Sequence, residues 1–93
     1  MALRFEWDTS KAKANIRKHE VSFEEAASVF LDPFSVTMAD PEHSLDEDRY
    51  VDIGYSDRGR LLVVVYTDRG TAIRVISCRK AIPKEREYYG ESN

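Results

Sequence analysis

Cysteine is nearly absent from this sequence. Its single copy, Cys78, excludes an internal disulfide and leaves too few thiols for a metal cluster. No apolar run approaches the roughly 20 residues that a membrane-spanning helix needs. The first residues, Met1 to Asp8, lack the apolar centre of a signal peptide and already carry charge. These absences predict an intracellular, cytoplasmic protein that has no membrane segment.

Motifs for metal or phosphate chemistry are also lacking. His19 and His43 stand far apart, outside any HxxxH or CxxC spacing, and no glycine-rich phosphate loop is present. No serine or cysteine nucleophile sits in a recognisable turn. We therefore expect no metal and no cofactor. Acid–base chemistry by histidine, glutamate or tyrosine, helped by cationic side chains, is what remains.

The chain has 93 residues, of which 42% are hydrophobic and 33% charged. These values are typical of one soluble globular domain, expected over residues 1–93. The net charge of −3 is unevenly distributed: residues 1–19 sum to +3, residues 20–57 to −10 and residues 58–93 to +4. If the two basic ends meet in space they form a cationic patch suited to a phosphate backbone. Interspersed surface charge is the plainer alternative.

The first half of the chain predicts a strand and two helices. Leu3–Trp7 alternates apolar and polar residues, as a half-buried strand does. A helix over Lys11–His19 follows, capped by Asp8, Thr9 or Ser10, with Ala12 and Ile16 toward the core. Ser22 and Glu25 form a capping box for a second helix, which Asp32–Pro33 ends.

The second half predicts four strands and a last helix. Phe34–Met38, Arg49–Ser56, Leu61–Thr67 and Thr71–Arg79 read as strands, and a polar loop from Ala39 to Asp48 contains His43. Leu61–Thr67 is apolar on both faces, so it should be central in the sheet. Pro83 begins a short charged helix that contains Glu85 and Tyr89.

The expected fold class is therefore α+β, in the order β-α-α-β-β-β-β-α. We expect an antiparallel meander with the two N-terminal helices on one face and the short C-terminal helix near its edge or open face. Regular alternation in the strand before Arg79 puts Arg74 on the opposite side from Arg79. One pocket could then hold both arginines only if the strand twisted or bulged.

The candidate acid–base groups are His19, His43, Glu85 and the tyrosines, with Lys18, Arg74, Arg79 and Arg86 as cations for a phosphate. Each also has a structural interpretation. His19 can stabilise the end of its helix, His43 can be a solvated surface histidine, and Arg79 can form a salt bridge with Glu85. Tyr88 and Tyr89 can stack on bases or anchor the last helix to the sheet.

Blocks of residues along nearly the whole chain resemble BrnT-type toxins, and they occur in the family's order. In the first half the similar residues are Phe5–Asp8, Lys11, Asn15, Lys18–His19, Val21–Ala26 and Asp32–Pro33. In the second half they are His43–Ser44, Glu47, Arg49, Ile53–Ser56, Gly59–Val64, Ile73–Ala81, Glu85–Arg86 and Tyr89. Each block is short, and the specificity lies in their combination.

This resemblance implies a RelE/ParE-like fold and a type II toxin that cuts RNA and inhibits translation. It also implies a cognate antitoxin with a ribbon-helix-helix part, through which alone the complex would bind operator DNA. Related metal-independent ribonucleases let a ribose 2′-hydroxyl attack the adjacent phosphate. By resemblance, the site residues are Lys18, His19, Arg79, Glu85 and Tyr89, followed by His43, Arg49 and Arg74.

Two other functions stay open at this stage. A non-catalytic, toxin-like module could act as partner and co-repressor of its antitoxin, which the acidic net charge favours. A ParE-like inhibitor of gyrase would share the fold and spare RNA.

Overall fold

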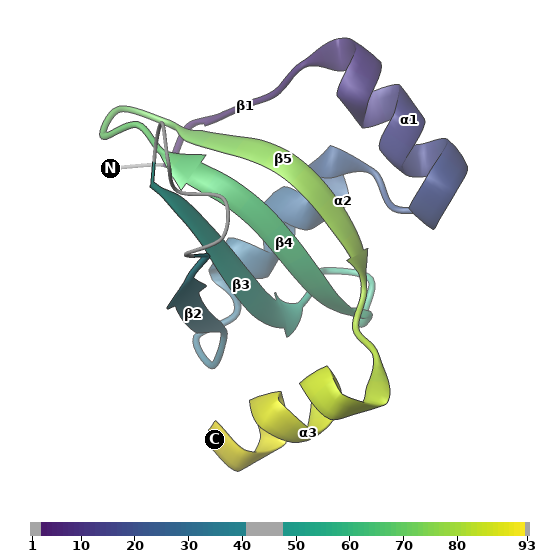
Figure 1. The fold of residues 1–93 in the computed structure, drawn as a ribbon, viewed down its shortest axis with the longest axis vertical. Helices are drawn as coiled ribbons and strands as arrows, with labels where there is room; N and C mark the ends of the chain where they lie inside the picture. Colours follow the sequence, from purple (N-terminus) through teal and green to yellow (C-terminus); the bar gives the residue numbers. More distant parts are fainter. Residues whose placement is uncertain (1–2, 41–47, 93) are drawn as a thin grey trace.

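Five strands form one sheet in the computed structural model, which describes residues 3–40 and 48–92. Across the sheet the strand order is β1-β5-β4-β3-β2 (Figure 1). The strands are β1 Phe5–Glu6, β2 Val36–Ala39, β3 Arg49–Tyr55, β4 Leu61–Asp68 and β5 Ile73–Lys80. The helices are α1 Thr9–His19, α2 Phe23–Ser28, the 3₁₀ turn η1 Val29–Leu31 and α3 Pro83–Ser92.

Strands β2 to β5 form an antiparallel meander, with β4 at the centre of the sheet. The prediction of a purely antiparallel sheet is wrong at one edge, because β1 pairs parallel to β5, with Phe5 opposite Ile73 and Glu6 opposite Arg74. Both helices and three strands separate β1 from β5 along the chain. A tight turn therefore does not impose the antiparallel direction on this pair.

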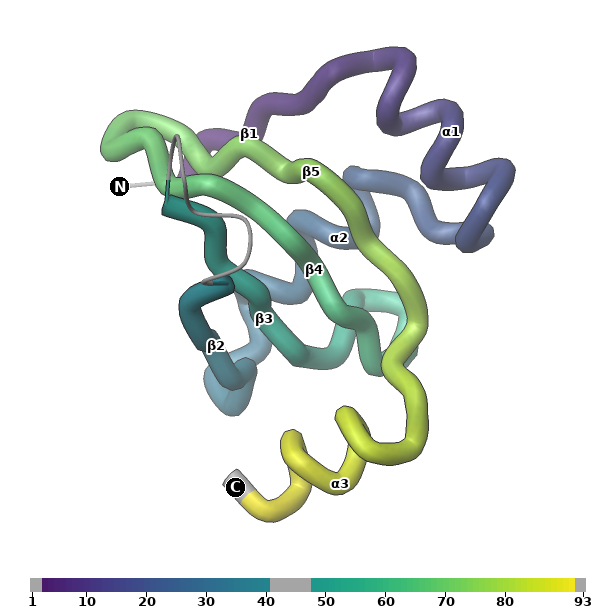
Figure 2. The backbone as a smooth tube through the Cα atoms, in the orientation of Figure 1, coloured from purple at the N-terminus to yellow at the C-terminus, as the bar shows by residue number. Residues whose placement is uncertain are grey.

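Apolar side chains pack on both faces of the sheet. The larger cluster lies under α1 and α2 and includes Val21, Phe23, Leu62, Val64 and Cys78. Figure 2 shows the last turn of α1 beside β5 and α2 behind the strands. The smaller cluster, on the other face, joins Ile53, Leu61 and Val63 to Ala81 and to Tyr89 of α3. The two N-terminal helices and α3 therefore lie on opposite faces.

Asp8, one of the three expected caps, begins α1 at Thr9 and not at the predicted Lys11, and the predicted cap at Ser22 is confirmed. The Asp8 side chain accepts a hydrogen bond of 2.9 Å from the Lys11 N–H, and Ser22 accepts one of 3.0 Å from the Glu25 N–H. Ala12 packs against the core as predicted, but the rest of the inward face of α1 differs from the prediction. Ile16 is 49% exposed, whereas Asn15 is 6% exposed. The spacing of apolar residues predicted the wrong face because the residue that contacts the sheet is Asn15, whose amide group can be buried since it is hydrogen-bonded.

A β-bulge in β5 overturns the predicted separation of Arg74 from Arg79. Val65 lies opposite Ser77, but the next residue, Tyr66, lies opposite Val75, so Ile76 is an extra residue. As a result, Arg79 lies opposite Val63 and Arg74 opposite Thr67. Val63 and Thr67 are four positions apart on one strand, so both arginines are on the same face of the sheet, the face of α3.

Gly54 lets β3 approach η1 closely. An added Cβ at this position would lie 2.9 Å from Val29 Cγ1 and 3.0 Å from Ser35 Cβ. Both neighbours belong to segments that are themselves packed or turning, so neither can move away freely.

We predict that Gly54→Ala lowers the free energy of unfolding by about 2 kcal/mol, because the new methyl group overpacks this contact. Gly90→Ala is the matched control, since an added Cβ there meets nothing within 4 Å and alanine favours a helix. Urea unfolding measures both. Equal stability of the two variants would contradict the packing argument.

Candidate functional site

A cationic hollow of about 340 Å³ lies where the end of α1 meets the end of β5. It is lined by Arg17, Lys18, His19, Glu20, Arg79, Lys80 and Ile82. Three of the predicted site residues, Lys18, His19 and Arg79, are thus brought together from two distant parts of the chain. The basic residues of the last turn of α1 supply one wall, and β5 supplies the other.

The Asn15 side chain sets the distance between these two walls. Its Nδ2 donates to the Val21 carbonyl at 2.9 Å and to the Cys78 carbonyl at 2.8 Å, and its Oδ1 accepts from the Cys78 N–H at 3.1 Å. Both backbone groups of Cys78 are therefore bound to α1. Since Arg79 directly follows Cys78, these bonds place it beside the end of α1.

Arg79 forms a two-point ion pair with Glu85 of α3. Nη1 donates to Oε1 at 2.8 Å and Nη2 donates to Oε2 at 2.7 Å. The carboxylate also accepts the Ile82 N–H at 2.9 Å, which caps the start of α3. The hydrogen bonds from Arg79, against the opposing effect of burial, lower the pKa of Glu85. Glu85 is therefore an anion that occupies both terminal nitrogens of the Arg79 guanidinium.

Tyr89, the other predicted residue of α3, is not among the residues that line the hollow. Its hydroxyl donates to Asp32 Oδ2 at 2.8 Å, and its ring contacts Tyr55 edge-on at 5.4 Å. Burial, together with the hydrogen bond to the Asp32 carboxylate, raises the pKa of Tyr89 to about 12. The residue attaches α3 to the turn before β2, and its phenol stays protonated at neutral pH.

Arg74 and Arg49 lie away from the hollow. Arg49 is opposite Thr67, and Thr67 is opposite Arg74, so the three residues form one row across the sheet. Arg79 is opposite Val63, which lies four residues from Thr67 along β4. The row is therefore about 13 Å from Arg79 along the strand direction. Arg74 donates to Glu6 at 3.1 Å and thereby joins β5 to β1. His43, also predicted, lies outside the described residues.

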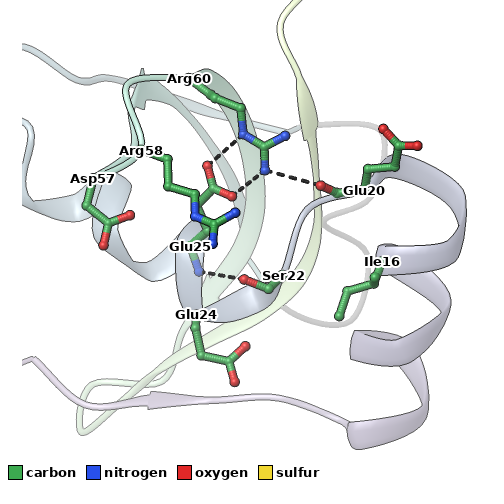
Figure 3. Close-up of a pocket in the computed structure, with 8 residues that line it drawn as sticks. All are labelled: Ile16, Glu20, Ser22, Glu24, Glu25, Asp57, Arg58 and Arg60. Atoms are coloured by element: carbon green, nitrogen blue, oxygen red, sulfur yellow. Dashed lines mark hydrogen bonds and ion pairs between the residues drawn. The ribbon is translucent and has the colours of Figure 1, made fainter.

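A second hollow, on the α2 side of the molecule, is held together by Glu25 and Arg60 (Figure 3). Glu25 is 5% exposed. Its carboxylate accepts hydrogen bonds from Arg60, through Nε at 2.9 Å and through Nη2, and from the Ser56 hydroxyl at 2.7 Å. Arg60 Nη2 also donates to the Glu20 carbonyl at 3.1 Å. The predicted capping box is therefore half formed, because the Glu25 side chain bonds to Arg60 and Ser56.

Comparison with known families supplies the decisive observation. The profile described as "Ribonuclease toxin, BrnT, of type II toxin-antitoxin system" matches residues 7–85, most of the chain. The chain belongs to the BrnT family. The crystal structure of the Brucella abortus ribonuclease toxin BrnT is similar, with a TM-score of 0.67 and 28% sequence identity over 87% of this chain and 99% of that one. No curated protein sequence shows significant similarity.

Family membership means that the chain is a toxin of a type II toxin–antitoxin system with a ribonuclease role and an antitoxin partner. The family match begins at Trp7 and ends at Glu85, so it includes every residue of the hollow. It stops four positions before Tyr89. Among the described residues, no group of three His, Cys, Asp or Glu side chains is placed to hold a metal ion. No helix within these residues is both long and apolar enough for a membrane span.

Sequence reasoning missed Asn15 and Asp32 as organising residues of the BrnT fold. Asp32 looked like a helix stop, yet its two oxygens accept the Phe34 N–H, the Tyr55 N–H and the Tyr89 hydroxyl. Burial opposes its charged form, but these hydrogen bonds keep the pKa of Asp32 below its usual value. For Asn15, the available signal was a poor helix former in the middle of a short helix.

We predict that Asn15→Ala lowers the free energy of unfolding by about 3 kcal/mol, because it leaves buried backbone groups of Cys78 and Val21 without partners. Asn15→Asp should also destabilise the protein, since a carboxylate keeps the acceptor and loses both donors. Lys13→Ala, an exposed position on α1, is the control. Urea unfolding would contradict this role if Asn15→Ala matched the control.

The Glu25–Arg60 pair predicts a pH dependence of stability. The hydrogen bond from Arg60 outweighs burial and lowers the pKa of Glu25 from its ordinary 4.5. The pair stabilises the fold fully above pH 4.5, the ordinary pKa of the carboxyl. This stabilisation is lost as the pH falls through the lower pKa that Glu25 has in the folded protein. Glu25→Gln should cost about 3 kcal/mol at neutral pH and flatten the acid limb of the stability curve.

Urea midpoints measured from neutral to acid pH test this expectation. Glu24→Gln, an exposed neighbour on the same helix, should retain the wild-type profile. An unchanged acid limb in Glu25→Gln would show that other carboxylates control the acid unfolding.

Proposed function

We propose that this toxin is an endoribonuclease that cleaves RNA without a metal ion and so inhibits translation. The observation that carries the proposal is the hollow in which Lys18, His19 and Arg79 lie together. Cationic side chains and an imidazole beside one another match the needs of phosphodiester cleavage, which are charge stabilisation and proton transfer.

In the proposed reaction the ribose 2′-oxygen attacks the adjacent phosphorus and loses its proton to a base. The bond from phosphorus to the 5′-oxygen breaks, and that oxygen takes a proton from an acid. The products are a 2′,3′-cyclic phosphate and a free 5′-hydroxyl. The charge that builds up on the phosphate oxygens in between is what Arg79 and Lys18 would stabilise.

His19 is the side chain of the hollow that we assign to proton transfer, because an imidazole can both accept and donate a proton near neutral pH. Glu85 is already ionised and bound to Arg79, so it holds the guanidinium in place until a phosphate replaces it. We assign Tyr89 to the attachment of α3 and Arg74 to the attachment of β1. Arg49, in the same row as Arg74, is assigned to RNA binding outside the hollow.

The proposed partner is an antitoxin with a ribbon-helix-helix part, through which the complex would bind operator DNA. We also propose that the fold is RelE/ParE-like. Both rest on membership of the BrnT family together with the α+β sheet described above.

A second candidate is a toxin-like module that binds its antitoxin and no longer cuts RNA. The observation that favours it is the Glu85 carboxylate on both terminal nitrogens of Arg79. Such an arrangement leaves the main phosphate ligand already paired.

We predict that the purified protein cleaves RNA in the presence of EDTA and that Arg79→Ala lowers the rate at least about 100-fold, the usual effect of removing a charge-stabilising donor. Arg74→Ala is the matched control, because Arg74 binds Glu6 outside the hollow. It should keep most of the activity. Gel analysis of a labelled RNA follows both variants.

Intact RNA with folded wild-type protein would favour the binding module, as would the absence of growth arrest on expression. Growth arrest with intact RNA and induced DNA damage signalling would favour a gyrase inhibitor. Equal losses in Arg74→Ala and Arg79→Ala would move the site from the hollow to the sheet face.

A further inference from the structure

An apolar groove of about 510 Å³ separates α3 from strands β2 and β3. It lies on the face of the sheet that α3 occupies, apart from the Glu25–Arg60 hollow. Met38, Val51 and Ile53 form its floor, and Ile82 and Tyr88 belong to its walls. The remaining lining residues are charged: Lys84, Glu85, Glu87 and Glu91. Three carboxylates against one ammonium give this rim a net negative charge.

The groove lies beside the side chains that attach α3 to the rest of the fold, among which Tyr89 also packs against the smaller apolar cluster. Glu85 binds Arg79 near the start of the helix, and Tyr89 binds Asp32 farther along. Near these attachments, apolar side chains stay open to solvent: Ile82 is 53% exposed and Tyr88 is 45% exposed. An apolar surface of this kind on a small protein typically marks an interaction site.

Beside the groove, β2 forms an edge of the sheet. The Asp40 N–H donates to the carbonyl of Arg49, which lies directly opposite, at 2.9 Å. In an antiparallel pair every second residue has its backbone N–H and C=O directed at the neighbouring strand. Counting back from Asp40, the backbone groups of Met38 and Val36 therefore point to β3, and those of Ala39 and Thr37 point outward. The edge can therefore accept another strand.

We propose that the antitoxin adds an extended segment to β2 and inserts its apolar side chains into this groove. The segment would alternate apolar and basic residues, because one face meets Met38 and Tyr88 and the rim offers Glu87 and Glu91. The inference rests on the proposed function, because it says where the antitoxin of that toxin would bind. It does not depend on the residues that cut RNA.

An occupied groove would also explain how the antitoxin neutralises the toxin. Ile82 lines both the groove and the cationic hollow, and Glu85 lines the groove while it binds Arg79. A segment packed against α3 would hold this helix on the sheet and keep Glu85 on Arg79. The phosphate of an RNA would then have no access to the guanidinium, although the hollow itself stays empty.

Charge reversal at the rim is the first test, with the cognate antitoxin as the probe and calorimetry as the measurement. Glu87→Lys should raise the Kd at least about tenfold, because it places a cation against the basic segment. Glu24→Lys makes the same change of charge at an exposed position of α2, on the other side of the sheet. It should leave the Kd within about twofold.

The edge of β2 is the second test. Ala39→Pro removes an N–H that points outward and keeps the bonds to β3, so the protein should fold and bind the antitoxin at least about tenfold more weakly. Hydrogen exchange of the wild-type complex should show new protection at Thr37 and Ala39. Circular dichroism of the free variants checks that they are folded.

Unchanged affinity in both Glu87→Lys and Ala39→Pro, with both variants folded, would overturn the proposal. New protection at β1 and around Leu31 instead of β2 would move the interface to the opposite edge, and would overturn it as well. Antitoxin binding with the predicted losses, in a protein that leaves RNA intact, would support the docking surface while the ribonuclease proposal fails.

Discussion

The three hydrogen bonds of Asn15 are the constraint on which the rest of the site depends. β1 pairs with β5 only at Ile73 and Arg74, so the edge of β5 beyond that point has no strand partner in the described sheet. The Asn15 amide binds that edge at Cys78 and binds Val21 at the same time. One buried side chain thereby fixes the end of α1, the turn into α2 and the strand that carries Arg79.

Arg79, in the β5 wall of the site, is also bound by Glu85 of α3. An ion pair with Arg79, a hydrogen bond to Asp32 and the apolar packing of Tyr89 attach α3, and an apolar groove stays open beside it. Under the proposed function, α3 would release Arg79 to a phosphate. Under the proposed docking of the antitoxin, a segment in the groove would hold the helix in place.

Local patterns predicted most of the elements. The cap at Ser22 and the central position of β4 followed from residue type and spacing, and Asp8 was one of the three residues expected to cap the first helix. The resemblance to BrnT-type toxins also named Lys18, His19 and Arg79 as candidate site residues, and the fold places all three at one hollow. Ile16 was misplaced because hydrophobic spacing cannot anticipate an amide that satisfies backbone groups 63 positions away.

The sequence by itself determined most of the helical and strand segments, because these depend on neighbours within a few positions, and it placed basic residues at both ends of the chain. Only the tertiary structure decided which of those residues meet. The bulge at Ile76 moved Arg74 to the face of Arg79, yet Glu6 holds Arg74 at β1. Asn15 brought Lys18 and His19 to Arg79. Such outcomes depend on strand register and on buried hydrogen bonds between distant segments, which no local pattern encodes.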